Sequence, residues 1–160
     1  MNVTKEKLKN INVGDIIEFA EIDWRVLEKT SDRVMVISEH VIAQRYYNPD
    51  ELDITWETCP IRKWLNEDFY SIFTDEEKDM IAETKVFTSG NSNETTEKIF
   101  LLSMEETYKY SSYVKPRSGY QSWWVRSNRK NGDGINYSGL FRGNIYSIAD
   151  GVRPVLNLKY

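Results

Sequence analysis

Residues 22–37 read IDWRVLEKTSDRVMVI, and this stretch decides the fold class. Its first six residues alternate apolar and polar side chains, which is typical of a half-buried β-strand. Thr30-Ser31-Asp32 has turn chemistry, and the apolar run at residues 33–37 predicts a second strand. Residues 16–19 (IIEF) add a strand after a turn at residues 13–15. The sequence therefore predicts an N-terminal antiparallel meander.

The middle of the chain predicts two short helices. Apolar residues recur at helical spacing over residues 61–72, which gives one apolar stripe, and Pro60 suits the first turn. Thr74 and Glu77 have the spacing of a capping box, in which each side chain bonds the other residue's backbone. We therefore expect a second helix that ends near residue 84.

The next part of the chain alternates between loop and core patterns. Residues 88–97 are polar, contain turn residues and show no periodicity, which indicates an exposed loop. Residues 98–102 (KIFLL) predict a buried strand. Ser103 and Glu106 form another capping box and predict a third short helix that ends near Tyr110.

The C-terminal part is rich in β-strand patterns. We expect turns at residues 131–134 (NGDG), 142–144 and 150–151, between strands at 122–127, 135–140, 145–148 and 152–156. Pro154 cannot donate a ladder hydrogen bond, so its strand should lie at an edge or carry a bulge. The whole pattern predicts one α+β domain over residues 1–160, with antiparallel sheets and two or three short helices packed alongside. Within it, residues 1–12 are a polar lead-in or short helix, and residues 13–160 form the body.

Composition narrows the classes of function. Hydrophobic residues make up 40% of the chain and charged residues 29%, which is enough apolar surface for a core. Aromatic residues reach 13%, a content that fits a β-rich core or a recognition surface. The net charge of −4 argues against a nucleic-acid partner, because such binding relies on basic side chains that neutralise phosphates.

The cysteine and histidine content and the hydropathy of the chain indicate whether a metal site or a membrane span is expected. A single cysteine and a single histidine cannot form a disulfide or a zinc cluster, so we expect no metal and no cofactor. No apolar run approaches the roughly 18 residues of a membrane span, and the N-terminus shows no signal peptide. We expect a cytoplasmic protein as the chain stands, or a secreted or surface protein if it is cut from a longer precursor.

The residue types that carry catalysis are few. Cys59 and His40 are candidate nucleophile and base, but a small buried thiol before Pro60 and an exposed imidazole at a strand end explain them better. The carboxylates at residues 75–79 are explained by a solvated helix start. The glycines of residues 131–134 lack the rest of a calcium or phosphate loop. We therefore expect no catalytic constellation.

Tyr, Asn and Arg side chains are concentrated in the C-terminal hairpins, and these are the residue types of rigid recognition surfaces. A solvent-facing sheet without a ligand is the alternative explanation. The predicted ligand surface consists of Asn128, Arg129, Tyr137, Arg142, Asn144 and Tyr146.

Four blocks in order carry a family resemblance. Residues 56–70 (WETCPIRKWLNEDFY), 98–103 (KIFLLS), 123–127 (WWVRS) and 151–155 (GVRPV) resemble the bacterial family named domain of unknown function 6273. The paired-Trp strand and the GVRP strand are also similar to C-type-lectin-like domains. This resemblance implies helices packed beside an antiparallel sheet, with a ligand surface on the late loops. The motifs for calcium-dependent sugar binding and the late cysteine pair of formylglycine-generating enzymes do not occur here.

The resemblance also implies roles for four side chains. Trp64 and Leu65 would anchor a helix in the core, and Trp124 would pack between sheet and helices. Arg153 would tie loop carbonyls together with its five donors. The expected function is a non-catalytic binding or display module for an unknown protein, peptide or glycan ligand. An enzyme that uses carboxylates and a structural or assembly protein are the alternatives, and the oligomeric state stays open.

Overall fold

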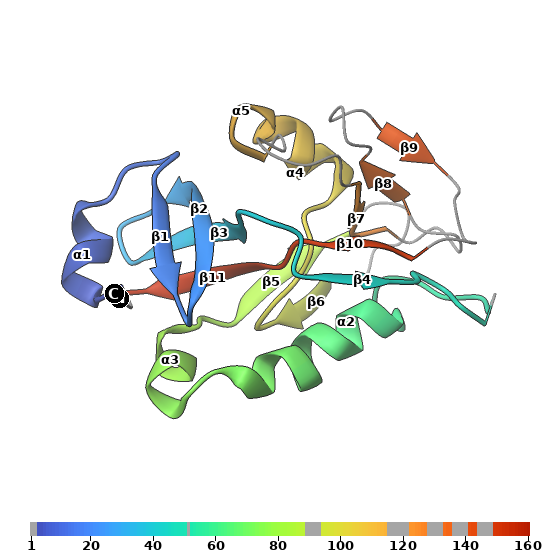
Figure 1. Ribbon diagram of the computed structural model, residues 1–160, viewed down its shortest axis with the longest axis horizontal. Helices are drawn as coiled ribbons and strands as arrows, with labels where there is room; N and C mark the ends of the chain where they lie inside the picture. The colour runs from blue at the N-terminus through green and yellow to red at the C-terminus, as the bar shows by residue number, and fades with distance from the viewer. Residues whose placement is uncertain are drawn as a thin grey trace.

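The computed structural model describes residues 3–50, 52–88, 94–114, 122–127 and 149–160, and the backbone of residues 133–135 and 141–143. The described residues form a four-stranded sheet, a five-stranded sheet and a two-stranded ribbon, with short helices beside them (Figure 1). This is the expected α+β class. The finer assignment to a C-type-lectin-like fold stays a prediction.

The four-stranded sheet has the order β1-β2-β3-β11. It consists of β1 (Ile16–Phe19), β2 (Ile22–Lys29), β3 (Arg33–Ser38) and β11 (Val155–Lys159). The predicted N-terminal meander is confirmed, because β1, β2 and β3 pair antiparallel in sequence order. The C-terminal strand β11 pairs with β3, so both ends of the chain share one sheet.

Of the two alternatives for residues 1–12, a polar lead-in or a short helix, the structure has the short helix. Helix α1 (Lys5–Asn10) begins after Thr4, whose side chain accepts a hydrogen bond from the Lys7 amide at 3.2 Å. Leu8 on this helix is fully buried and belongs to the hydrophobic core. The predicted polar lead-in therefore contributes to the core.

The predicted helix over residues 61–72 is present but irregular. It consists of α2 (Pro60–Trp64), a π-helical turn η1 (Leu65–Phe69) and a 3₁₀ turn η2 (Tyr70–Ile72). A π turn holds more residues than an α turn, so the apolar stripe rotates out of phase. Ile72 is consequently 56% exposed, and the expectation that it faces the core is wrong.

Both predicted capping boxes are confirmed. Thr74 and Glu77 open α3 (Asp75–Met80), and Ser103 and Glu106 open α4 (Met104–Lys109), which α5 (Ser111–Val114) follows. Helix α3 ends at residue 80 and not near 84. The chain there turns extended, since Ile81 forms a bridge with Leu158 and the next strand begins at residue 84.

The expected loop at residues 88–97 is wrong over its last four residues. β5 (Thr84–Phe87) and β6 (Glu94–Glu97) pair antiparallel, while residues 89–93 lie outside the described part. Thr95 and Glu97 point inward, which a polarity pattern cannot reveal. The expected strand at 98–102 is buried over residues 99–102, but it pairs only through a bridge from Phe100 to Val155.

The five-stranded sheet has the order β4-β10-β7-β8-β9. Its strands are β4 (Ala43–Arg45), β10 (Asp150–Val152), β7 (Trp123–Val125), β8 (Asp133–Ile135) and β9 (Phe141–Gly143). β7, β8 and β9 pair antiparallel. The predicted strand at residues 135–140 overlaps β8 only at Ile135, and the predicted strand at residues 145–148 lies outside the described residues. The last strand does not continue this meander, because β10 pairs parallel with β7 and antiparallel with β4.

Three predicted turns overlap strands, and those assignments are wrong. Residues 133–134 lie in β8, residues 142–143 in β9 and residues 150–151 in β10. Glycine marks a close approach of backbones at one of these positions. A Cβ atom on Gly151 would lie 2.5 Å from the main-chain oxygen of Ser122 on the neighbouring segment.

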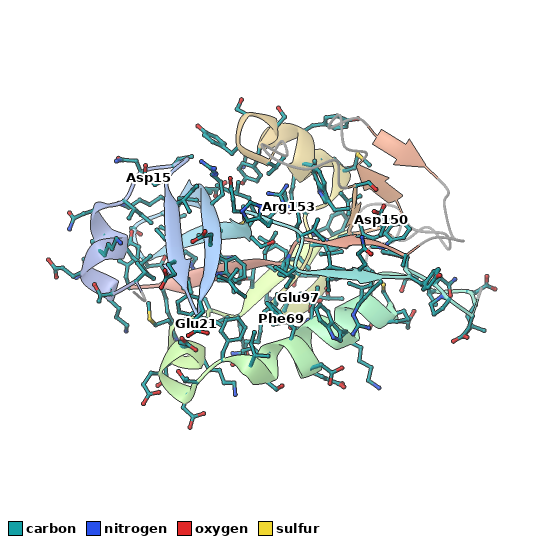
Figure 2. All side chains as sticks on the ribbon, in the orientation of Figure 1. Asp15, Glu21, Phe69, Glu97, Asp150 and Arg153 are labelled. Atoms are coloured by element: carbon teal, nitrogen blue, oxygen red, sulfur yellow. The ribbon has the colours of Figure 1, made fainter. Side chains whose placement is uncertain are left out.

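A hydrophobic core connects the two sheets and the helices, with contributions from Leu8, Trp24, Leu65, Phe100, Trp124 and Leu158. The chain leaves the five-stranded sheet after β10 and enters the other sheet at β11, and Arg153 and Pro154 form the crossing (Figure 2). The predicted single strand at residues 152–156 is wrong, because Val152 ends β10 and Val155 begins β11 in the other sheet, and Pro154 lies between the two strands. Leu65 and Trp124 are buried as expected, whereas Trp64 is only half-buried.

Candidate functional site

One residue of the predicted ligand surface lies in the described part of the five-stranded sheet. Arg142 lies in β9, opposite Gly134 of β8. The other five predicted residues, Asn128, Arg129, Tyr137, Asn144 and Tyr146, lie outside the described residues. β9 is the last strand of the sheet order and β8 separates it from β7, so both strands lie at one end of this sheet (Figure 1).

Tyr47 fixes the end of β7, the strand that pairs with β8. Its hydroxyl donates to the main-chain oxygen of Ser127 at 2.6 Å and accepts from the Ser127 amide at 3.1 Å. Its ring lies 5.3 Å from that of Trp124, whose indole nitrogen donates to the Arg45 oxygen at 2.7 Å. The end of β7 is therefore rigidly attached to β4 and to the loop that follows it.

Arg126, which follows β7, is a buried structural group and not a surface contact. Its guanidinium donates to the Thr88 hydroxyl at 2.9 Å and to the main-chain oxygens of Leu101 and Phe87 at 2.5 and 2.8 Å. It also forms an ion pair with Glu106 at 3.2 Å. One side chain thus joins the ribbon, the 98–102 segment and the first turn of α4.

Arg153 has the structural role that the resemblance implied. Its guanidinium donates to the main-chain oxygens of Ser38 at 3.1 Å, Val114 at 2.5 Å and Glu39 at 3.2 Å. The guanidinium also lies 4.8 Å from the ring centre of Trp123. Burial lowers the pKa of Arg153 to about 10, so the group stays charged at neutral pH. It fastens the crossing between the two sheets to α5.

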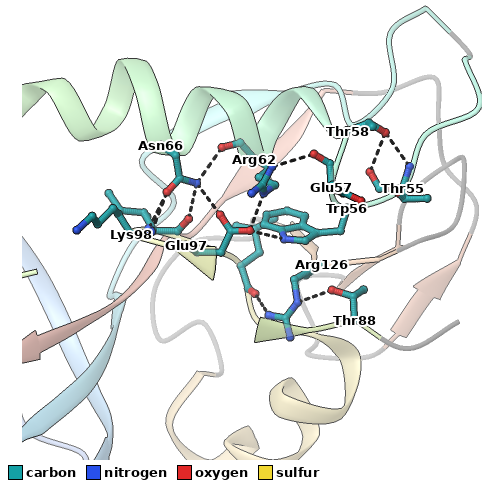
Figure 3. A network of polar contacts seen from close by, with 12 residues as sticks. Thr55, Trp56, Glu57, Thr58, Arg62, Asn66, Thr88, Glu97, Lys98 and Arg126 are labelled. Carbon is teal, nitrogen blue, oxygen red and sulfur yellow. Dashed lines mark hydrogen bonds and ion pairs between the residues drawn. The ribbon is translucent and has the colours of Figure 1, made fainter. Parts of the chain in front are cut away.

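A second polar cluster joins the helical segment to the ribbon (Figure 3). Glu97 is 1% exposed, yet its carboxylate accepts from Arg62 at 2.6 Å, Trp56 at 3.2 Å and Asn66 at 3.1 Å. The Asn66 side chain also accepts from the amides of Lys98 and Ile99 at 3.0 and 3.1 Å. A buried carboxylate is tolerated here because three donors replace its hydration.

Sequence reasoning missed this Asn66–Glu97 cluster. Glu97 was predicted to lie in an exposed loop. Asn66 lies in a helix that the sequence predicted only from its apolar stripe. A usable signal was the position of Glu97 directly before the apolar run of residues 98–102. The cluster lies beside a pocket of about 440 Å³ that Glu57, Glu67 and Glu83 also line. Because the donors around Glu97 already hold its oxygens, this carboxylate serves packing better than proton transfer.

The nucleophile candidates are not arranged for catalysis. Cys59 is 1% exposed, and burial raises the pKa of its thiol to about 11, so the reactive thiolate is scarce at neutral pH. Its Sγ donates weakly to the Tyr47 main-chain oxygen at 3.8 Å. His40 is exposed. The interpretation of Cys59 as a small buried residue is confirmed.

Within the described ranges, no three His, Cys, Asp or Glu side chains are grouped so that they could hold a metal ion. Across the same part of the chain, none of the helices combines the length and apolar character needed to cross a membrane.

Comparison with known proteins gives one match. The model of a family described as domain of unknown function (DUF6273) matches residues 31–160, which is more than half of the chain. Neither a curated protein nor a solved structure matches the chain.

Proposed function

The chain belongs to the family described as domain of unknown function (DUF6273). We propose that it is a non-catalytic binding or display module for a protein, peptide or glycan ligand, because Tyr, Asn and Arg residues are concentrated in its C-terminal segments. The proposed ligand surface is the outer half of the five-stranded sheet around β8 and β9. Its side chains are Asn128, Arg129, Tyr137, Arg142, Asn144 and Tyr146.

The position of β8 and β9 carries this proposal. Both strands lie beyond β7 in the sheet order, on the side away from β10 and β4. The strand beneath them is fixed by Tyr47 and Arg126 through buried hydrogen bonds. A recognition surface is commonly carried by segments that a rigid scaffold holds in place, which supports the proposal.

The bonding of the buried charged groups also supports binding over catalysis. Glu97, Arg126 and Arg153 are each engaged with several protein groups. Catalytic acids and bases need a proton that they can exchange with a substrate within hydrogen-bond reach. Side chains engaged in this way stabilise the scaffold.

The test is a binding screen against glycan, peptide and protein libraries, followed by alanine variants of the six residues. We expect at least one of these variants to lower the affinity for a confirmed ligand by about tenfold or more. Asn10→Ala and Asn12→Ala, beside α1 at the other end of the molecule, are the matched controls (Figure 1). A ligand whose affinity ignores all six substitutions would overturn the proposal.

A further inference from the structure

A separate cleft opens between α4 and one face of the four-stranded sheet. Its volume is about 320 Å³, at the lower end of the about 300–1,000 Å³ found for ligand pockets. A cleft of this size suits a small ring and not an extended chain. The side chains that matter for its chemistry are Glu28, Arg33, Met35, Thr84, Lys109 and Asn157.

The floor of the cleft is a cross-strand row of the sheet. Met35 of β3 pairs with Glu28 of β2 on one side and with Asn157 of β11 on the other. Paired residues point to the same face of a sheet, so these three side chains line the cleft together. The row places an apolar side chain between two polar ones.

Asn157 is a buried polar group with unused bonding capacity. The residue is 6% exposed, and its Nδ2 donates to the Thr84 hydroxyl at 2.8 Å. Asn157 lines the cleft, and among the contacts of the described residues no protein donor reaches its Oδ1. The Thr84 hydroxyl accepts from Asn157 and keeps its own proton for donation. An acceptor and a donor therefore lie side by side on the floor.

The charges around the cleft are balanced. Lys109 forms an ion pair with Glu28 at 3.0 Å, and the Tyr110 hydroxyl donates to the same carboxylate. Glu106 also lines the cleft, and its carboxylate forms an ion pair with Arg126, which does not line it. Since each carboxylate has a cationic partner, the cleft offers no uncompensated charge to an ionic ligand.

We propose that this cleft binds one neutral polyhydroxylated ring, the chemical class of a monosaccharide unit. Each ring hydroxyl both donates and accepts, which matches the adjacent Asn157 acceptor and Thr84 donor. The apolar side chain of Met35 contacts the C–H face of the ring. This site uses other residues than the β8 and β9 surface, and it does not depend on that proposal.

The test is an NMR titration of the ¹⁵N-labelled chain with free glucose, galactose, mannose and N-acetylglucosamine. We expect saturable shifts of the Thr84, Asn157 and Lys109 amides with at least one sugar. Thr84→Val and Asn157→Ala should each weaken that affinity by about tenfold, because each removes one hydrogen bond from a desolvated site. Glycine and inorganic phosphate are the charged probes.

Thr95→Val is the matched control for Thr84→Val. Thr95 lies on the same ribbon, and its hydroxyl is buried without a hydrogen-bond partner among the described residues. This variant should keep full sugar affinity. The proposal is overturned if no sugar gives saturable shifts at the cleft, if the charged probes bind there instead, or if a folded Thr84→Val variant binds as tightly as the wild type.

Discussion

The side-chain amide of Asn66 donates to the carboxylate of Glu97 at 3.1 Å and to the main-chain oxygen of Ile99 at 2.8 Å. Its carbonyl oxygen accepts from the amides of Lys98 and Ile99. In the segment after β6, the Asn66 side chain thus makes the hydrogen bonds to the backbone of Lys98 and Ile99 that a neighbouring strand would otherwise make. This relationship explains how that segment stays buried while only Phe100 forms a bridge.

The first prediction concerns Asn66→Asp. The substitution keeps the shape of the side chain but replaces a donor with a carboxylate beside Glu97. Like charges at this distance in a partly buried site should destabilise the fold by roughly 3 kcal/mol. Urea unfolding at neutral pH measures the effect. Glu67→Gln, at an exposed position on the same helical segment, should stay within about 0.5 kcal/mol of the wild type.

The second prediction concerns Arg126→Lys. An ammonium group cannot reach the Thr88 hydroxyl, the Leu101 oxygen and the Phe87 oxygen together, as the guanidinium does. We expect a loss of about 3 kcal/mol in the free energy of unfolding, because buried acceptors lose their donors. Arg33→Lys at the exposed ion pair with Asp32 should leave the unfolding midpoint unchanged. Equal stability of both variants would contradict the assigned role.

Local signals predicted much of the fold. The alternation in residues 22–27 and the capping boxes at Thr74 and Ser103 depend on neighbours in sequence, and the structure confirms them. The errors arise where distant segments decide. Glycines at 134 and 151 favour turns locally, but both lie in strands that pair with β7, and at Gly151 the neighbouring backbone leaves no room for a Cβ atom. The parallel pairing of β10 with β7 has no local signature.

The polar interior was predicted less well than the apolar core. The role of Arg153 followed from the family resemblance, and its three carbonyl partners confirm that role. Glu97 ends a polar stretch of sequence, which places it at the surface, and Asn157 is a polar residue between Leu156 and Leu158. Their burial depends on partners from other segments, because the helix supplies a donor to Glu97 and the Thr84 hydroxyl of β5 accepts from Asn157. Such partners become visible only when the fold brings them together.

The third prediction separates two tryptophans that the sequence treated alike. Trp124 is 2% exposed and packs against Tyr47, so Trp124→Ala should cost about 3–5 kcal/mol. Trp64 is half-buried, and its ring lies 4.2 Å from the guanidinium of Arg45. Trp64→Ala should therefore cost clearly less, roughly 1–2 kcal/mol. Thermal unfolding of the two variants measures both losses of stability. A larger loss for Trp124→Ala supports the structure, whereas the sequence alone predicts equal losses.

The fourth prediction is the pH dependence that Cys59 imparts to stability. Burial raises the pKa of its thiol from 9.0 to about 11 in the folded chain. The unfolded chain therefore loses the proton first as pH rises, and stability that is fully present below pH 9.0 decreases up to about pH 11. This contribution changes by at most about 1.4 kcal/mol per pH unit. Other groups titrate in the same window, so the informative quantity is the difference between the wild type and Cys59→Ala.

Cys59→Ala removes the thiol and leaves a small cavity whose cost is independent of pH. The wild type should lose stability more steeply than this variant between pH 9.0 and about 11, and both should follow parallel curves at lower pH. A thiol reagent provides an independent measurement. In the native chain it should react only as fast as the chain opens, because Cys59 is 1% exposed, whereas in denaturant it should react at once. Parallel curves throughout the alkaline range, or rapid labelling of the native chain, would contradict the burial of this thiol.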